Sequence, residues 1–270
     1  MKASGKSRAA RKPGPAWKGR SVRSLRLSDL MALIRGEIAF LCVPRYLSPD
    51  LCADIVRRFL AGPHEKHAYG RDKTRQLGAA VAVMVLEREA YFARAPKIMA
   101  ALRELYRGGE DPMLKLRRDM DACTGWKYVP AVENGRPYAS DMIGALEPGS
   151  GVVLHADSPS LQPDLFIAKF PVKLSWNVYL SNSERGGALT LYRKLFAEKD
   201  LPLHHGYEGY EAVVVDGIPK AVYAPSPGDL VLFNPCHFHE VEVTGGGGWR
   251  SSAHAWIAVD PEGKRMTYWS

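Results

Sequence analysis

A histidine and an aspartate one residue apart, His155 and Asp157, are the best-placed pair for metal chemistry in this 270-residue chain. They close the run VVLHAD, whose apolar start predicts a β-strand. Because side chains alternate between the faces of a strand, both point the same way, about 7 Å apart. A second histidine would complete a triad of two histidines and one carboxylate, which leaves coordination positions open on Fe(II). Taken alone, the pair could equally be a hydrogen-bonded pair at the surface.

The third metal ligand must come from a distant strand that folds back beside the first. The candidates are His237 and His239, in the segment FNPCHFHEVEV. We favour His239, because it lies eleven residues before Arg250 and is followed by a strand-like run of valines. His237 remains open, and whichever histidine is not a ligand could donate a hydrogen bond near the metal.

An arginine follows at a suitable distance. Four glycines at 245–248 predict a turn, after which Arg250 and Ser252 share one face of a strand. A guanidinium group near the metal would suit a bidentate contact with a carboxylate. His155, Asp157, His239 and Arg250 together supply three metal ligands and one anchor for a dicarboxylate, as an Fe(II)- and 2-oxoglutarate-dependent oxygenase requires.

The strand KLSWNVYLS carries two polar residues on one face, Ser175 and Asn177, and apolar residues on the other. If the polar face looks inward, Ser175 lies near the open side of the iron and Asn177 lies near 2-oxoglutarate. Ordinary packing or solvent exposure is the alternative. His254, on the last long strand, is expected to be a core histidine.

The composition excludes several classes of protein. The chain is 46% hydrophobic and 24% charged, which is ordinary for a soluble globular protein and not for a disordered one. No stretch approaches 18 consecutive apolar residues, so no membrane span is expected. The four cysteines form no CxxC pair, which argues against a disulfide scaffold or a zinc ribbon and predicts a reducing, cytoplasmic location.

The formal net charge of +8 arises in the N-terminal segment. Residues 1–28 hold nine Lys or Arg and no acid, whereas the other 242 residues hold 28 bases and 29 acids. A near-neutral body argues against a nucleic-acid surface. We expect residues 1–24 to form a basic, disordered tail before a single domain at 25–270.

Helical patterns come first and strands follow, which predicts an α+β protein with helices packed outside one β-core. Helices are expected at 28–36, 48–60, 87–106 and 112–122, and the run 81–86 could be a strand or part of a helix. After Gly135, six to eight short strands alternate with Gly and Pro turns, as in an antiparallel sandwich or barrel.

The order HxD, distal His, then RxS resembles the Fe(II)/2-oxoglutarate oxygenase superfamily with a double-stranded β-helix (jelly-roll) fold. GGALTLY at 186–192 looks like the central strand of that fold. Within the superfamily, AVYAPSPGDLVLFN and the terminal YWS are similar to the group of N-succinyl amino-acid hydroxylases and indole-alkaloid aliphatic halogenases. The resemblance covers 135–270, the expected jelly-roll core, and extends to the helical support at 25–134 in outline.

The resemblance implies Fe(II), 2-oxoglutarate and O₂ as cofactor and co-substrates. The distal carboxylate of 2-oxoglutarate would meet Arg250, with help from Ser252. In the related halogenases Gly or Ala replaces the carboxylate ligand, which lets chloride take its coordination position. Here Asp157 is present, so hydroxylation is expected.

We expect a small-molecule substrate, such as a free or N-substituted amino acid. Basic and aromatic residues in 70–85, 124–138 and 158–170 would suit an anionic molecule with an apolar part; they are Arg71, Lys73, Arg75, Trp126, Lys127, Tyr128, Arg136, Phe166 and Lys169. Two alternatives are the same fold acting on a protein or nucleic acid, and a non-catalytic metal-binding jelly-roll module.

Overall fold

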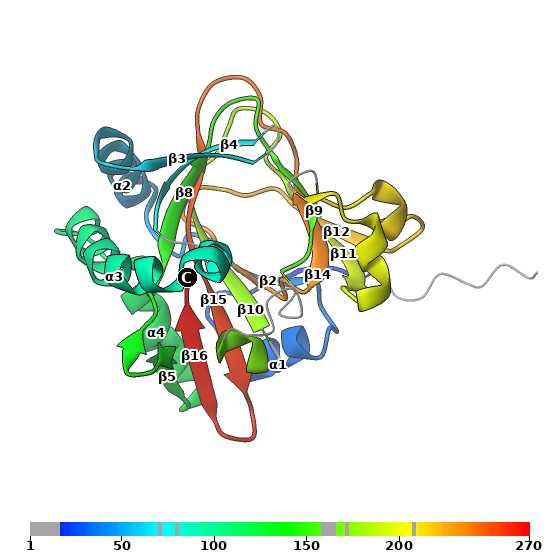
Figure 1. The fold of residues 1–270 in the computed structure, drawn as a ribbon, viewed down its shortest axis with the longest axis horizontal. Coiled ribbons are helices and arrows are strands. Elements are labelled where there is room, and N and C mark those ends of the chain that lie inside the picture. The colour runs from blue at the N-terminus through cyan, green and yellow to red at the C-terminus, as the bar shows by residue number, and fades with distance from the viewer. Residues whose placement is uncertain (1–16, 70–71, 79–80, 158–165, 171–172, 207–208) are drawn as a thin grey trace, which may run out of the picture.

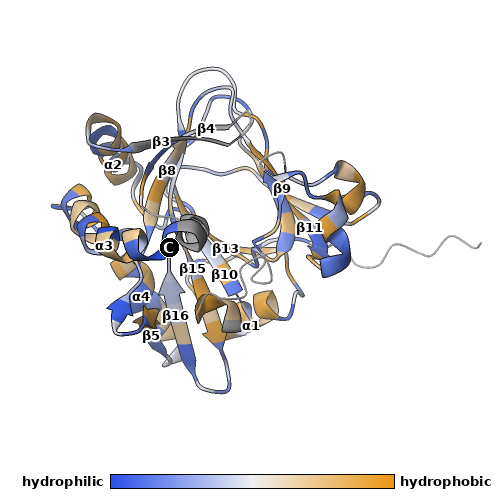
Figure 2. Ribbon diagram, in the orientation of Figure 1, coloured by the Kyte–Doolittle hydropathy of each residue, from blue (hydrophilic) through white to orange (hydrophobic). Residues whose placement is uncertain are grey.

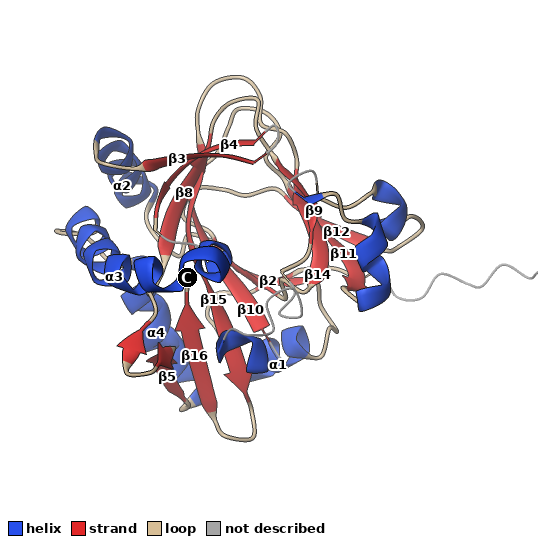
Figure 3. Cartoon of the chain, in the orientation of Figure 1, coloured by secondary structure: helices blue, strands red, loops and turns tan. Residues whose placement is uncertain are grey.

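Two β-sheets face each other, and helices cover the outside of the larger sheet in the computed structural model (Figures 1 and 3). The structure describes residues 17–69, 72–78, 81–157, 166–170, 173–206 and 209–270. In that part of the chain, no helix is both long and apolar enough to cross a membrane. The expected combination of large sheets with few helices is confirmed.

The larger sheet contains ten strands in the described residues. Eight of them follow one another in the order β1 (Arg20–Ser21), β2 (Phe40–Val43), β13 (Leu230–Phe233), β10 (Lys173–Ser181), β15 (Arg250–Asp260), β8 (Met142–Leu146), β4 (Asp72–Leu77) and β3 (Glu65–Tyr69). Strand β16 (Arg265–Trp269) pairs with β15 and with β5 (Lys127–Pro130). The long strands β10 and β15 therefore lie side by side at its centre.

The smaller sheet has the order β12 (Lys220–Tyr223), β11 (Leu189–Leu195), β14 (His237–Val241) and β9 (Val152–His155). A separate short pair joins β6 (Val132–Glu133) to β7 (Arg136–Pro137). Among the described residues, 3₁₀ helices include η2 (Phe166–Lys169), η3 (Glu198–Leu203) and η5 (Ala212–Val215).

Four α-helices belong to the N-terminal half: α1 (Leu27–Ile34), α2 (Pro49–Ala61), α3 (Val81–Leu105) and α4 (Pro112–Thr124). Ser48 caps α2 by accepting the Leu51 N–H, and Asp111 caps α4. Residues 81–86 are helical, although Glu87 interrupts the regular dihedrals of α3. Helix α3 carries both hydrophobic and hydrophilic residues in Figure 2, and Tyr91, Ala95 and Leu102, at helical spacing, are among its buried side chains.

The alternation along β10 separates two environments. Leu174, Trp176 and Val178 are buried in the main hydrophobic core, which also contains residues of all four helices. Ser175 and Asn177 face the other way, toward the smaller sheet. The apolar core beneath β10 thus fixes which of its side chains can reach a site between the sheets.

Two boundaries differ from the sequence-based expectation. The N-terminal half is not purely a helical support, because β3, β4 and β5 lie within 25–134 and join the larger sheet. Residues 17–24 are not a tail either. Trp17 is only 4% exposed and donates its indole N–H to the Gly36 carbonyl, and β1 pairs with β2. The basic charge of this segment predicted a disordered tail, but Trp17 anchors its last residues to the domain.

Candidate metal centre and the adjoining cavity

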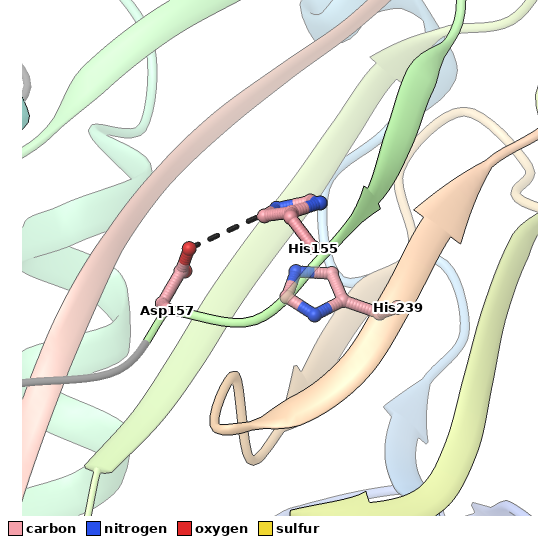
Figure 4. Close-up of side chains that lie close together, drawn as sticks. All are labelled: His155, Asp157 and His239. Atoms are coloured by element: carbon pink, nitrogen blue, oxygen red, sulfur yellow. Dashed lines mark ion pairs between the residues drawn. The ribbon is translucent and has the colours of Figure 1, made fainter. Parts of the chain in front are cut away.

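His155, Asp157 and His239 converge at one end of the smaller sheet (Figure 4). His155 ends β9, and β14 places His239 directly opposite it in the antiparallel ladder. Asp157 follows in the loop after β9, held by its backbone N–H to the Pro235 carbonyl. One potential ligand atom from each residue lies within 4.8 Å of the others. Two paired strands and one turn therefore assemble the cluster.

Both histidines present the same ring nitrogen to the cluster. Nδ1 of His155 lies 2.8 Å from the Val153 carbonyl, and Nδ1 of His239 lies 2.8 Å from the His237 carbonyl. A carbonyl oxygen only accepts, so each Nδ1 carries a proton, which leaves Nε2 of each ring as the atom that would bind a metal. Burial and the neighbouring His155 lower the pKa of His239, which favours the neutral, metal-binding form.

The carboxylate of Asp157 is oriented by Trp256. The indole N–H of Trp256 donates to Oδ2 at 2.8 Å, while Oδ1 lies 3.7 Å from Nε2 of His155. One oxygen is thus engaged by the protein and the other faces the histidines. This donor set of two imidazole nitrogens and one carboxylate oxygen suits Fe(II) with open positions.

His237 takes another environment. Its ring packs against Trp17, with ring centroids 5.0 Å apart, and it does not belong to the cluster formed among the described residues. The geometry brings His239, and not His237, beside His155 and Asp157.

A cavity of about 230 Å³ opens beside the cluster, between the two sheets. Ser175 and Asn177 of β10 line it, as do Arg250 and Ser252 of β15. The four residues expected to bind the co-substrate therefore share one cavity with the three expected metal ligands. Leu146, Leu189, Phe233 and Val241 form apolar wall segments of the same cavity.

Arg250 is the buried cation of this cavity, 8% exposed. Its Nε donates to the Gly187 carbonyl at 2.8 Å, and the guanidinium lies 5.1 Å from the centroid of the Tyr179 ring. Gly187 has φ +76°, and a Cβ there would come within 3.0 Å of the arginine side chain. No carboxylate in the described ranges forms an ion pair with Arg250, and burial lowers its pKa. A buried, unpaired guanidinium fits an anionic ligand.

The three polar neighbours have weak internal hydrogen bonds that leave them available to a ligand. Asn177 donates to Ser175 Oγ at 3.3 Å, and Ser252 Oγ lies 3.3 Å from Nδ1 of His254. Their contact with 2-oxoglutarate remains a prediction.

Sequence reasoning missed two cavity residues on β15. His254 and Trp256 continue the alternation begun by Arg250 and Ser252, and both line the cavity. Burial lowers the pKa of His254 to about 4, so it is neutral at pH 7. The period of two along this strand was the signal that could have identified both residues.

Two of the basic residues expected around the substrate have other partners. Arg75 lies over the Trp249 ring, 3.5 Å from Glu147, and Arg136 pairs with Glu89. Arg71 and the side chains of Lys73 and Lys169 lie outside the described residues. Contact of these residues with an anionic substrate stays a prediction.

Comparison with known proteins identifies the family. The model of the carrier-protein-independent halogenase WelO5 family matches residues 27–270. The chain belongs to this family. Its membership confirms the predicted superfamily and the likeness to the halogenase and amino-acid hydroxylase group.

Two curated relatives share part of the chain. L-gamma-glutamyl-L-propargylglycine hydroxylase of Streptantibioticus cattleyicolor is 29% identical over 162 residues, which is 59% of each chain. Leucinostatins biosynthesis cluster protein S of Purpureocillium lilacinum is 32% identical over 117 residues, 41% of this chain and 46% of that protein. The matches thus span about half the length of these relatives.

Solved structures share the fold. An N-substituted L-amino acid dioxygenase from Burkholderia ambifaria, in complex with alpha-KG, has a TM-score of 0.60 at 16% identity, over 89% of this chain and 90% of that one. HygX from Streptomyces hygroscopicus, with nickel and 2-oxoglutarate bound, has a TM-score of 0.53 at 14% identity, over 86% and 87%.

Proposed function

We propose that the protein is an Fe(II)- and 2-oxoglutarate-dependent dioxygenase that hydroxylates an unactivated carbon of a small molecule. The observation that carries this proposal is the placement of His155, Asp157 and His239 around one point, beside a cavity that contains the unpaired Arg250. We further infer that the two facing sheets form a double-stranded β-helix, since the strands that carry the site come from both sheets.

The residues present fit the implied cofactors. His155 and His239 offer free Nε2 atoms and Asp157 offers Oδ1, so these three would hold the iron. Bound iron with 2-oxoglutarate would supply the activation of O₂. Arg250, with Ser252, would bind the distal carboxylate of 2-oxoglutarate, and Ser175 and Asn177 would contact the rest of that molecule or the open side of the metal.

The protein's own contribution is orientation and exclusion of water. Trp256 holds the Asp157 carboxylate, the backbone carbonyls fix both imidazole tautomers, and apolar side chains that form part of the cavity wall would help to exclude water. A preset donor geometry needs no rearrangement when the ligand binds.

Hydroxylation is favoured over halogenation by one residue. The name of the matched family refers to a halogenase, but a carboxylate is present at Asp157. With iron bound, this carboxylate would take the coordination position that a halide would need. Hydroxyl transfer is therefore the expected outcome.

The substrate class rests on the relatives. Their names describe a hydroxylase of a γ-glutamyl amino acid and a dioxygenase of N-substituted L-amino acids. A free or N-substituted amino acid, which carries a carboxylate at neutral pH, is the class we propose here. These names do not favour a macromolecular substrate, and the complete donor set does not favour a non-catalytic module. The four free cysteines accord with the expected cytoplasmic location.

The test is anaerobic titration of the metal-free protein with Fe(II) and 2-oxoglutarate. A weak charge-transfer band near ~500 nm is expected from a 2-oxo acid bound to ferrous iron with open positions. Succinate release on admitting O₂ with a panel of amino acids and N-acyl amino acids would then identify substrates. Absence of the band, with metal demonstrably bound, would contradict the proposal.

A further inference from the structure

Lys173 opens β10 with a buried cation. Its side chain is 5% exposed, and its Nζ lies 5.7 Å from the centroid of the Trp269 ring. Within the described ranges it forms neither an ion pair nor a hydrogen bond through Nζ. Burying an ammonium group without an anionic partner costs free energy, and an anion bound beside Nζ would lower that cost.

The alternation of β10 puts Lys173 on the cavity side. Ser175 and Asn177 line the cavity, and Lys173 continues their row one step toward the start of the strand. Its partner across the ladder is Ala258, while Ser175 is paired with Trp256. Strands β10, β15 and β16 lie side by side there (Figure 1), so Trp256 and Trp269 are direct neighbours in the ladder.

Groups near the candidate metal centre influence the pKa of Lys173. Burial lowers the pKa of Lys173 to about 8, and Cys236 and Asp157 act in the opposite direction. The ammonium group is therefore mostly protonated at pH 7. It lies close enough to Asp157 to sense its charge, yet no ion pair joins them.

Lys173 is too far from Arg250 to share one small ligand. Arg250 and Ala258, the ladder partner of Lys173, are eight residues apart on β15, about 26 Å along an extended strand. Lys173 does not itself line the cavity that contains Arg250; it lies one strand step beyond Ser175, whose ladder partner Trp256 does line that cavity. Arg250 would bind 2-oxoglutarate, so Lys173 would be available to a second anion.

We propose that Lys173 binds the carboxylate of the substrate and that Trp256 contacts the adjoining apolar part of that molecule. This inference rests on the proposed function, and it assigns the anionic end of the substrate to one residue. Lys173 is a specificity-determining residue in this scheme, since it recognises a charge and does not touch the metal.

The experiment measures binding to the full chain loaded anaerobically with Fe(II) and 2-oxoglutarate. Calorimetry compares matched pairs: N-acetyl-L-leucine with N-acetyl-L-leucinamide, and the corresponding phenylalanine and γ-glutamyl-leucine pairs. We expect a carboxylate to bind at least about 10-fold more tightly than its amide. Lys173→Met should abolish that preference by weakening the carboxylate alone, and Lys173→Arg should retain most of it.

Lys220→Met is the matched control, because Lys220 is exposed and lies 5.9 Å from the Tyr192 ring in a similar cation–π contact. It should leave the preference unchanged. If Lys173→Met fails to fold, Lys173→Gln replaces it.

Three results would overturn the inference: equal weakening of acid and amide, a carboxylate preference that survives in Lys173→Met, or no binding of any pair to the loaded protein. In each case the charge-transfer band persists and the proposed function stands. If wild-type protein shows no band, both proposals fail.

Discussion

Trp256 donates its indole N–H to the carboxylate of Asp157, across 99 residues of sequence, at 2.8 Å. The bond leaves Oδ1 on the side of His155 and His239. Hydrogen bonds to metal-binding carboxylates fix their orientation, and their loss typically weakens metal binding about 10- to 100-fold. Trp256 is therefore a positioning residue for the metal centre.

Trp256→Phe tests this role while keeping a large apolar side chain. We expect Fe(II) to bind about 10- to 100-fold more weakly, with little change in the midpoint of unfolding. Anaerobic competition with a chromogenic chelator measures the affinity. Trp126→Phe, outside the cavity, is the control. Unchanged affinity in Trp256→Phe would show that the indole does not orient the carboxylate.

Arg250→Ala should mainly affect 2-oxoglutarate. Each charge-assisted hydrogen bond contributes about 1.5–3 kcal/mol, so the apparent KM for 2-oxoglutarate should rise at least about 10-fold. Ligand binding also stabilises the folded state, so the increase in Tm caused by 2-oxoglutarate should disappear in this variant. Arg265→Ala, an exposed change on β16, should preserve both effects. A variant that still gains the full Tm shift would place the carboxylate elsewhere.

Asp157→Gly should exchange one activity for another. Removal of the carboxylate takes away one metal ligand, so hydroxylation should fall at least about 100-fold. The indole N–H of Trp256 would lose its acceptor and face the freed position, an arrangement that suits chloride. Mass spectrometry of products formed in saturating chloride should detect a chlorinated fraction. Asp157→Asn, which keeps a side-chain oxygen, should give none, and the absence of chlorination in Asp157→Gly would contradict the expectation.

Much of the site followed from local pattern. Period two along β10 and β15 placed Ser175 with Asn177, and Arg250 with Ser252, in one cavity. Asp157 was expected on the same strand as His155; it lies in the loop after β9 and still reaches the same cluster. The choice between His237 and His239 needed the register, because both residues lie on one face of the same strand. The ladder that sets His239 opposite His155 is a long-range feature that no local pattern encodes.

Local sequence patterns did not predict strands β3 and β4 at one edge of the larger sheet. Strands β3 and β4 carry charged and polar residues, so apolar periodicity did not distinguish them from a loop. Strand β4 pairs with β8 and strand β3 pairs with β4, and this pairing supplies the stabilisation that propensity lacks. Lys173 was missed for a related reason, since a lysine at the start of a strand is normally solvated.

The buried charge of Lys173 should make stability depend on pH. Its pKa falls from 10.5 to about 8 on folding, so between these values the unfolded chain binds more protons and stability rises with pH. The free energy of unfolding should rise by about 3 kcal/mol over this range, and the rise should be absent in Lys173→Met. Urea unfolding at pH 7 and pH 10.5, without ligands, measures the difference. Lys220→Met should behave as the wild type, and equal slopes in all three proteins would show that the ammonium group is compensated.

Trp17 should mark the start of the folded domain. It is 4% exposed, donates to the Gly36 carbonyl and packs on His237, and loss of a buried tryptophan costs about 3–5 kcal/mol. We therefore expect removal of residues 1–16 to leave Tm unchanged, whereas removal of residues 1–24, which also deletes β1, should lower it by several degrees. Trp17→Ala in the full chain separates the two contributions. Equal Tm values for both truncations would show that the folded domain begins after residue 24 and that Trp17 does not stabilise it.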